Sequence, residues 1–113
     1  MKYLLMICAE EGIRLTPEEQ AEASSGTESW VTEMDGRGIR LQGERLRPVR
    51  DATTVRVRDK EVLIADGPFA ETKEQIVGFD IVECADLEEA LEVAAKHPVA
   101  RFGAIEVRPF WPM

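Results

Sequence analysis

The first strand of the sequence constrains the fold most, because it is apolar on consecutive positions. Five apolar residues run from Tyr3 to Ile7, and the stretch continues to Ala9. A strand with one face in water alternates apolar and polar residues, so an unbroken run predicts a strand covered on both faces. One layer of helices covers only one face of a sheet. We therefore expect a second subunit on the other face, which makes the chain a homodimer.

The first helix has a strong start signal. Thr16, Pro17 and Glu19 combine a capping box with a proline at the first helical position, and predict a helix that runs to about Met34. Residues 24–26 (Ser-Ser-Gly) are poor helix formers and are expected to weaken its middle. The residues expected to face inward are Thr27, Trp30, Val31 and Met34.

The second helix is predicted to begin at Asp86, with Glu89 at the capping-box position, and to end before Pro98. His97 is expected to be a surface residue that complements the helix dipole in the last turn. The residues expected to face inward are Leu87, Ala90, Leu91 and Ala94.

Further strands are predicted at 39–43, 53–58, 61–65, 78–84 and 104–111. Val55 and Val57 are expected to point inward, and Asp59-Lys60 to reverse the chain in a hairpin. The order of elements predicts one α+β domain over residues 1–113, a ferredoxin-like split βαβ fold with an inserted β-hairpin.

The two cysteines are expected to be reduced thiols, as is usual in the cytosol. If the first strand and residues 78–84 form a parallel central pair, Cys8 and Cys84 end at the same side of the sheet and are neighbours.

Charge and composition narrow the classes of function. The net charge of −8 disfavours nucleic-acid binding. Residues 37–60, however, hold eight basic and three acidic side chains. This asymmetry fits a small anionic ligand or the acidic face of a second subunit, and it equally fits a solvated, arginine-rich hairpin. The apolar runs are too short to span a membrane and lack signal-peptide features, so the chain is expected to be cytoplasmic.

The candidate chemistry lies around the turn Asp66–Phe69 (DGPF). Asp66 either braces this turn or presents a carboxylate beside a cleft, where it is the candidate catalytic residue. Lys73 and Glu71 follow closely as candidate ligand-binding residues, and Glu44 follows another predicted strand. Arg108 is a further ligand-binding candidate, or the partner of Glu106 in a surface ion pair, since the two share one face of the last strand.

No metal-binding or cofactor-binding motif is present. One histidine and two separated cysteines do not form a zinc pattern, and the sequence has no P-loop, dinucleotide fingerprint or nucleophile elbow. Haem is not expected either, because His97 lies outside the faces predicted to line a cleft. The sequence therefore predicts neither a cofactor nor a metal.

Residues 66–75, followed by Gly78-Phe79, resemble the defining motif of the DGPF branch of YCII-related proteins. The start of the chain and its last strand are similar to that family as well. The resemblance implies a ferredoxin-like fold that dimerises sheet to sheet as an α+β barrel. The chain departs from the family pattern at Val77 and Asp80, and Asp80 would make a cleft more polar if it faces inward. The histidine on the first strand of YCII proper has no counterpart, so an Asp-His pair does not carry over.

Two functions remain open. The first is a cleft for a small molecule near Asp66, with proton transfer as the most economical chemistry if the protein is an enzyme. The second is a non-catalytic regulatory or ligand-sensing module with a protein partner, such as the extracytoplasmic-function sigma factors with which the resemblance associates DGPF proteins.

Overall fold

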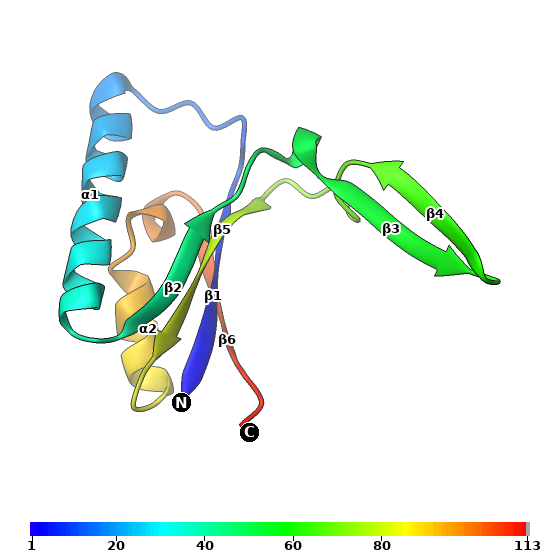
Figure 1. Cartoon of the computed structure of the whole chain (residues 1–113). Helices are drawn as coiled ribbons and strands as arrows, with labels where there is room; N and C mark the ends of the chain where they lie inside the picture. Colours follow the sequence, from blue (N-terminus) through cyan, green and yellow to red (C-terminus); the bar gives the residue numbers. More distant parts are fainter. Residues whose placement is uncertain (113) are drawn as a thin grey trace.

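The computed structural model describes residues 1–112 and has a four-stranded sheet, two helices and a separate hairpin (Figure 1). The elements are β1 (Lys2–Ala9), α1 (Pro17–Gly36), β2 (Arg40–Arg45), the 3-10 turn η1 (Val49–Asp51), β3 (Thr53–Arg58), β4 (Glu61–Asp66), β5 (Gln75–Glu83), α2 (Leu87–Ala95), the 3-10 turn η2 (Pro98–Arg101) and β6 (Ala104–Pro109). None of the described helices is long and apolar enough to span a membrane.

The main sheet has the order β2-β5-β1-β6, with every neighbouring pair antiparallel. This is the predicted ferredoxin-like α+β fold, with β3 and β4 as the inserted hairpin. The prediction of a parallel central pair was wrong. The βαβ unit returns β2 parallel to β1, and β5 fills the slot between them by running antiparallel to both. Lys2 therefore opposes Glu83 and Cys8 opposes Ile76, which places Cys8 and Cys84 at opposite ends of β1.

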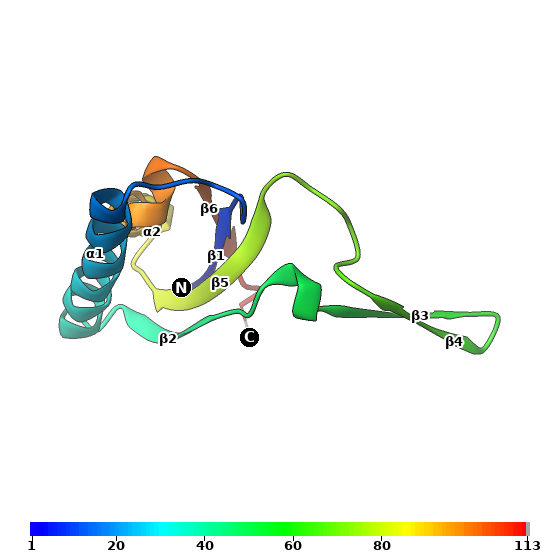
Figure 2. The ribbon, with the colours of Figure 1, turned by 90° about the horizontal axis from the view of Figure 1, so that it is seen from above.

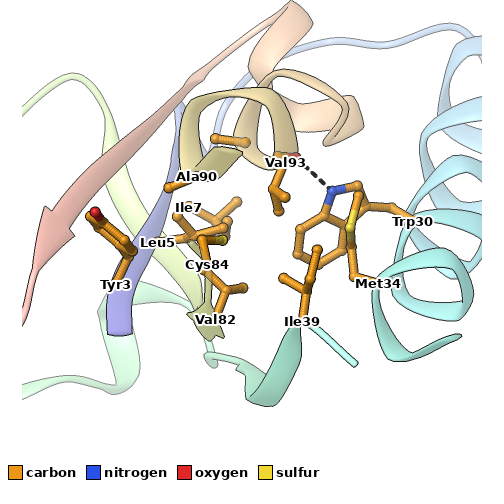
Figure 3. Close-up of a cluster of buried hydrophobic side chains, with 11 residues drawn as sticks. Tyr3, Leu5, Ile7, Trp30, Met34, Ile39, Val82, Cys84, Ala90 and Val93 are labelled. Atoms are coloured by element: carbon orange, nitrogen blue, oxygen red, sulfur yellow. Dashed lines mark hydrogen bonds between the residues drawn. The ribbon is translucent and has the colours of Figure 1, made fainter. Parts of the chain in front are cut away.

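The helices cover one face of the sheet and enclose the core (Figure 3). Leu5 of β1 and Val82 of β5 are fully buried against Val93 of α2 and Met34 of α1. The indole Nε1–H of Trp30 donates to the carbonyl oxygen of Val93 at 2.9 Å and joins the two helices. Of the residues predicted to face inward on α2, Ala90 and Ala94 are buried. Leu87 and Leu91 are about half exposed, because the buried stripe runs through Val93 instead.

Helix α1 has its buried side chains only near its C-terminal end. Its capping box is present, and Trp30 and Met34 are its buried residues. The helix continues through residues 24–26 without a break. A Cβ atom added to Gly26 would lie 2.9 Å from Cγ of Pro98, so this glycine allows η2 to approach the helix. Between the first half of α1 and the sheet the packing leaves a cavity.

On the other face of the sheet, the two central strands β1 and β5 are apolar, the edge strands are polar, and no layer covers them among the described residues. Leu4 and Met6 of β1 oppose Ile81 and Phe79 of β5, and all four side chains are half-buried. We call this surface the open face. On the helix side of the same strands, Tyr3, Leu5 and Ile7 are buried. Both faces of β1 are therefore apolar, as the sequence indicated, but helices cover only one.

The β3–β4 hairpin, which we call the arm, extends away from the rest of the molecule (Figures 1 and 2). Asp59 and Lys60 have positive φ angles of 50° and 66°, as a two-residue hairpin turn requires. The prediction that Val55 and Val57 point inward was wrong, since they are 60% and 55% exposed. The Cα radius of gyration is 16.1 Å, whereas a compact domain of this length has about 13 Å. The arm accounts for this expansion.

Candidate functional site

A cavity of about 580 Å³ lies between the first half of α1 and the sheet. Its size is within the range of roughly 300–1,000 Å³ that is typical of ligand pockets. Its lining residues come from β1, α1, β2, β5 and the η2 region: Ile7, Ala9, Gln20, Ala23, Ser24, Thr27, Val31, Arg40, Gly43, Glu44, Arg45, Val77, Gly78, Phe79, Asp80, His97, Val99 and Phe102. The two buried polar residues of the described chain, Asp80 and His97, are both among them.

Asp80 is the buried carboxylate of the cavity, with 7% of its surface exposed. Arg40 Nε donates to its Oδ1 at 2.9 Å, and Arg40 Nη2 donates to the carbonyl oxygen of Gly43 at 3.1 Å. A Cβ atom at Gly43 would overlap the Asp80 carboxylate, so only glycine leaves room for this ion pair. Burial raises the pKa of Asp80, and the charge and hydrogen bond of Arg40 partly offset that rise.

The second oxygen of Asp80, Oδ2, has no protein partner among the described residues. No fully enclosed side-chain nitrogen or oxygen of these residues lacks a partner, so Oδ2 must keep contact with free space. Since Asp80 lines the cavity, a ligand there would find an unused acceptor.

His97 is the buried imidazole of the cavity, with 4% of its surface exposed. The backbone N–H of Val99 donates to its Nδ1 at 3.1 Å, and the ring packs edge-on against Trp30 with centroids 4.8 Å apart. Burial lowers the pKa of His97 to about 4, so the ring is neutral at pH 7. Because Nδ1 accepts, the neutral ring carries its proton on Nε2, which has no protein acceptor in the described structure.

The cavity therefore offers two complementary groups to a ligand. Asp80 Oδ2 accepts a hydrogen bond or a proton, and His97 Nε2–H donates one. A carboxylate whose pKa is raised by burial is closer to the range useful for proton transfer at neutral pH. Apolar residues such as Ile7, Val31 and Phe102 line the same space. The arrangement fits a small molecule with an apolar body and polar groups.

A smaller cavity of about 180 Å³ lies near the start of α1 and η2, lined by Leu15, Glu19, Glu22, Ala23, Pro98, Arg101 and Phe102. Neither of the two buried polar residues lines it. It therefore lacks the two buried polar residues that distinguish the larger cavity.

Asp66 ends β4 at the base of the arm and is exposed. Other groups hold the turn. Gly67 has the expected positive φ, 94°, its N–H donates to the carbonyl oxygen of Ala52 at 2.8 Å, and the hydroxyl of Thr54 donates to the carbonyl oxygen of Gly67 at 2.8 Å. Within residues 1–112 the Asp66 carboxylate makes no hydrogen bond or ion pair. It is therefore free to meet a ligand, although it does not line the larger cavity.

The other predicted ligand-binding residues lie in three places. Glu71 and Lys73 are exposed in the loop between β4 and β5. Glu44 is exposed on β2 and lines the cavity. Arg108 lies on β6 opposite Leu4 and forms an ion pair with Glu106, at the border of the open face. Of the predicted site residues, only Glu44 lines the cavity, and no ion pair of the described chain joins Asp66 to Lys73.

Sequence reasoning missed the central part of the cavity. His97 was expected at the surface, but the chain turns into η2 after α2 and buries the ring beneath Trp30. The premise used against haem, that His97 lies away from any cleft, was therefore wrong. Asp80 was noted as a departure from a family pattern, and it does face the helix side of the sheet. The available signal was a charged residue in the alternating strand 78–82, opposite Gly43.

Comparison with known proteins gives a family and one relative. A family model described as the YCII-related domain matches residues 1–113. An uncharacterized protein of Rhizobium meliloti (strain 1021), R00369, is 48% identical over 67 residues, which cover 58% of this chain and 54% of that protein. The matched region thus spans about half the length of the relative.

Proposed function

The chain belongs to the YCII-related domain family, and we propose that it is a homodimer that binds a small molecule in the cavity between α1 and the sheet. One observation carries the proposal. Asp80 and His97 are both more than nine-tenths buried, and each has a polar side-chain atom without a protein partner in the described chain. No fully enclosed side-chain nitrogen or oxygen of the described residues lacks a partner, so these two atoms keep contact with free space, and a ligand in the cavity would supply their partners.

The lining favours a ligand with an apolar body and one anionic group. Arg40 is already paired with Asp80, but Arg45, which also lines the cavity, forms no ion pair among the described residues. A ligand carboxylate or phosphate would find its counter-charge there. If the protein is an enzyme, Asp80 is the group suited to exchange a proton with the ligand, while the neutral His97 would donate a hydrogen bond to an oxygen.

Asp66 belongs to the proposal as a second polar group, together with Glu71 and Lys73 of the same loop. Its assignment to a site rests on the resemblance of residues 66–75 to the DGPF branch and on its free carboxylate. The dimer rests on the open face, where Leu4, Met6, Phe79 and Ile81 have no covering layer within residues 1–112.

A thermal-shift screen of small carboxylic and phosphoric acids tests the site. We expect a hit to raise the Tm of the wild type, and Asp80→Asn and Ser24→Phe to abolish that rise. Ser24 lines the cavity, whereas its exposed neighbour Ser25 does not, so Ser25→Phe is the matched control and should keep the response. Loss of the response in both serine variants, or in neither, would contradict binding in this cavity. Asp66→Asn shows separately whether the DGPF turn contributes.

An alternative function is favoured by the basic segment at residues 37–60. In this proposal the protein is a non-catalytic module that contacts a protein partner, such as an extracytoplasmic-function sigma factor, through its arginines. Arg47 is 86% exposed at its side chain and pairs only with Asp51 within the described chain. Reversing the charges of Arg47 and Arg50 should then abolish pull-down of the partner and leave ligand-induced stabilisation intact. Unchanged pull-down would exclude this surface.

A further inference from the structure

One face of the arm is apolar and exposed. In the β3–β4 register Val55 opposes Ile64 and Val57 opposes Val62, so these four side chains share a face. They are between 55% and 69% exposed. A two-stranded hairpin with no further packing is marginally stable in water. We call these four residues the arm's apolar face, and something must cover it.

The arm projects on the side of the sheet that the helices leave open. Figure 2 shows α1 and α2 on one side of the sheet and the arm extending on the other. Six residues per strand give the arm a length of about 20 Å, whereas two stacked sheets lie about 10 Å apart. A second copy packed against the open face would lie beside the arm. The arm would reach past that copy's sheet to its helix layer.

Two uncovered apolar surfaces on the same side of the sheet, the open face and the arm's apolar face, favour a second copy as the occupant. The arm itself, residues 53–66, holds three basic and three acidic side chains. Helix α1 holds six carboxylates and no lysine or arginine. Lys60 lies in the turn at the tip of the arm, where a partner's acidic helix would meet it, whereas Arg56 and Arg58 lie on the opposite face from the arm's apolar face. Attraction between Lys60 and the carboxylates of that helix would favour this register.

We infer that the arm clasps a second copy of this chain, with the arm's apolar face packed on that copy and Lys60 at its tip beside the copy's α1. Thr53 and Asp66 are the next opposed pair of the register on this same face. Asp66 therefore faces the partner, so that its carboxylate belongs to a site formed between the two subunits. The inference rests on the proposed homodimer and deepens it. It also accounts for Asp66 being free within its own chain.

Cross-linking tests the clasp directly. A carbodiimide joins a lysine amine to a carboxylate with no spacer, and we would apply it to mixed dimers of light and isotopically heavy chains. We expect mass spectrometry to find Lys60 joined to a glutamate of α1 in mixed light-heavy pairs. Lys60→Gln should remove this cross-link and leave the dimer.

Dimer dissociation gives a second readout. Val55→Thr combined with Ile64→Thr keeps β-branched side chains but makes the apolar face polar, and should weaken the dimer by about tenfold or more. The matched control is Leu63→Thr, on the opposite face of the arm, which should leave the dissociation constant within about threefold of the wild-type value. A dimer with no Lys60 cross-link and no response to the double variant would overturn the clasp while leaving the proposed dimer standing. A monomeric wild type would overturn both.

Discussion

Neighbouring residues of β1 lie on two faces of the sheet that differ in what covers them. Leu5 is fully buried beneath the helices, whereas Met6, the next residue, is half-buried on the open face. Ile64 of the arm is more exposed than either residue, with 69% of its surface accessible. The three residues are similar in hydrophobicity, so hydrophobicity alone does not decide burial within one chain. What decides it is whether the chain has another layer to place over the side chain.

The largest expected effects come from substitutions at Leu5 and Met6. Leu5→Ala removes a fully buried side chain and should lower the free energy of unfolding by about 3 kcal/mol at every protein concentration. Met6→Ala should instead act through the proposed dimer, so that its effect on Tm grows as the protein is diluted toward dissociation. Chemical denaturation at several concentrations measures both. If Met6→Ala lowers stability equally at all protein concentrations, the open face does not depend on a second chain for its stability.

Removing the cation beside Asp80 has the next largest expected effect on stability. Arg40→Met leaves a carboxylate buried without its partner and should cost about 3 kcal/mol at pH 7. The substitution should also raise the pKa of Asp80 further, because burial and the negative charge of Asp35 would then act on it without the opposing effect of Arg40. When an acid has a higher pKa in the folded state than in the unfolded state, its contribution to stability is complete below the unfolded-state pKa. This contribution is lost as the pH rises through the folded-state pKa. The variant should therefore recover toward the wild type near pH 4, as denaturant unfolding would reveal. An equal loss at both pH values would mean that the ion pair matters only through packing.

The buried imidazole predicts a pH dependence of its own. The pKa of His97 is about 4 in the fold and near 6.5 unfolded, so the unfolded chain binds more protons between these values. Stability linked to His97 is then complete above pH 6.5 and is lost as pH falls through 4, by up to about 3 kcal/mol. His97→Asn can still accept from Val99 N–H but cannot titrate, and should flatten the curve in this window. A slope that persists in the variant would assign the pH dependence to other groups.

The smallest expected effect is at Gly26. Replacing an exposed helical glycine by alanine normally stabilises a helix by about 1 kcal/mol. Here the new methyl would lie 2.9 Å from Pro98 Cγ, so the clash should cancel or reverse that gain. Gly36→Ala meets no atom within 4 Å and serves as the control. A gain in Tm at Gly26 as large as that at Gly36 would show that η2 can move aside.

Local patterns predicted the elements well. The caps at Thr16 and Asp86, the turn at Asp59-Lys60 and the order of strands follow from residues adjacent in sequence, where backbone hydrogen bonding leaves few alternatives. Long-range placement was harder to predict. Whether Val55 is buried depends on whether another part of the protein packs beneath the hairpin. The alternation of apolar and polar residues in β3 is the same whether or not it does.

The candidate site shows the same limit. Asp80 and His97 are 17 residues apart in sequence and line one cavity only because β5 and η2 lie on either side of it. His97 carries no motif, and its burial follows from the path of the chain after α2. Asp66 was found because its turn has a characteristic sequence. The surroundings of its carboxylate depend on what lies opposite the arm, which a single chain does not specify.

The mass of the wild-type protein in solution tests the central claim, that the open face and the arm are covered by a second copy. Light scattering at micromolar concentration should give twice the 12.7 kDa of one chain. A particle of 12.7 kDa would contradict the account, because the apolar surfaces on the open face and the arm would then be exposed to water in the functional protein.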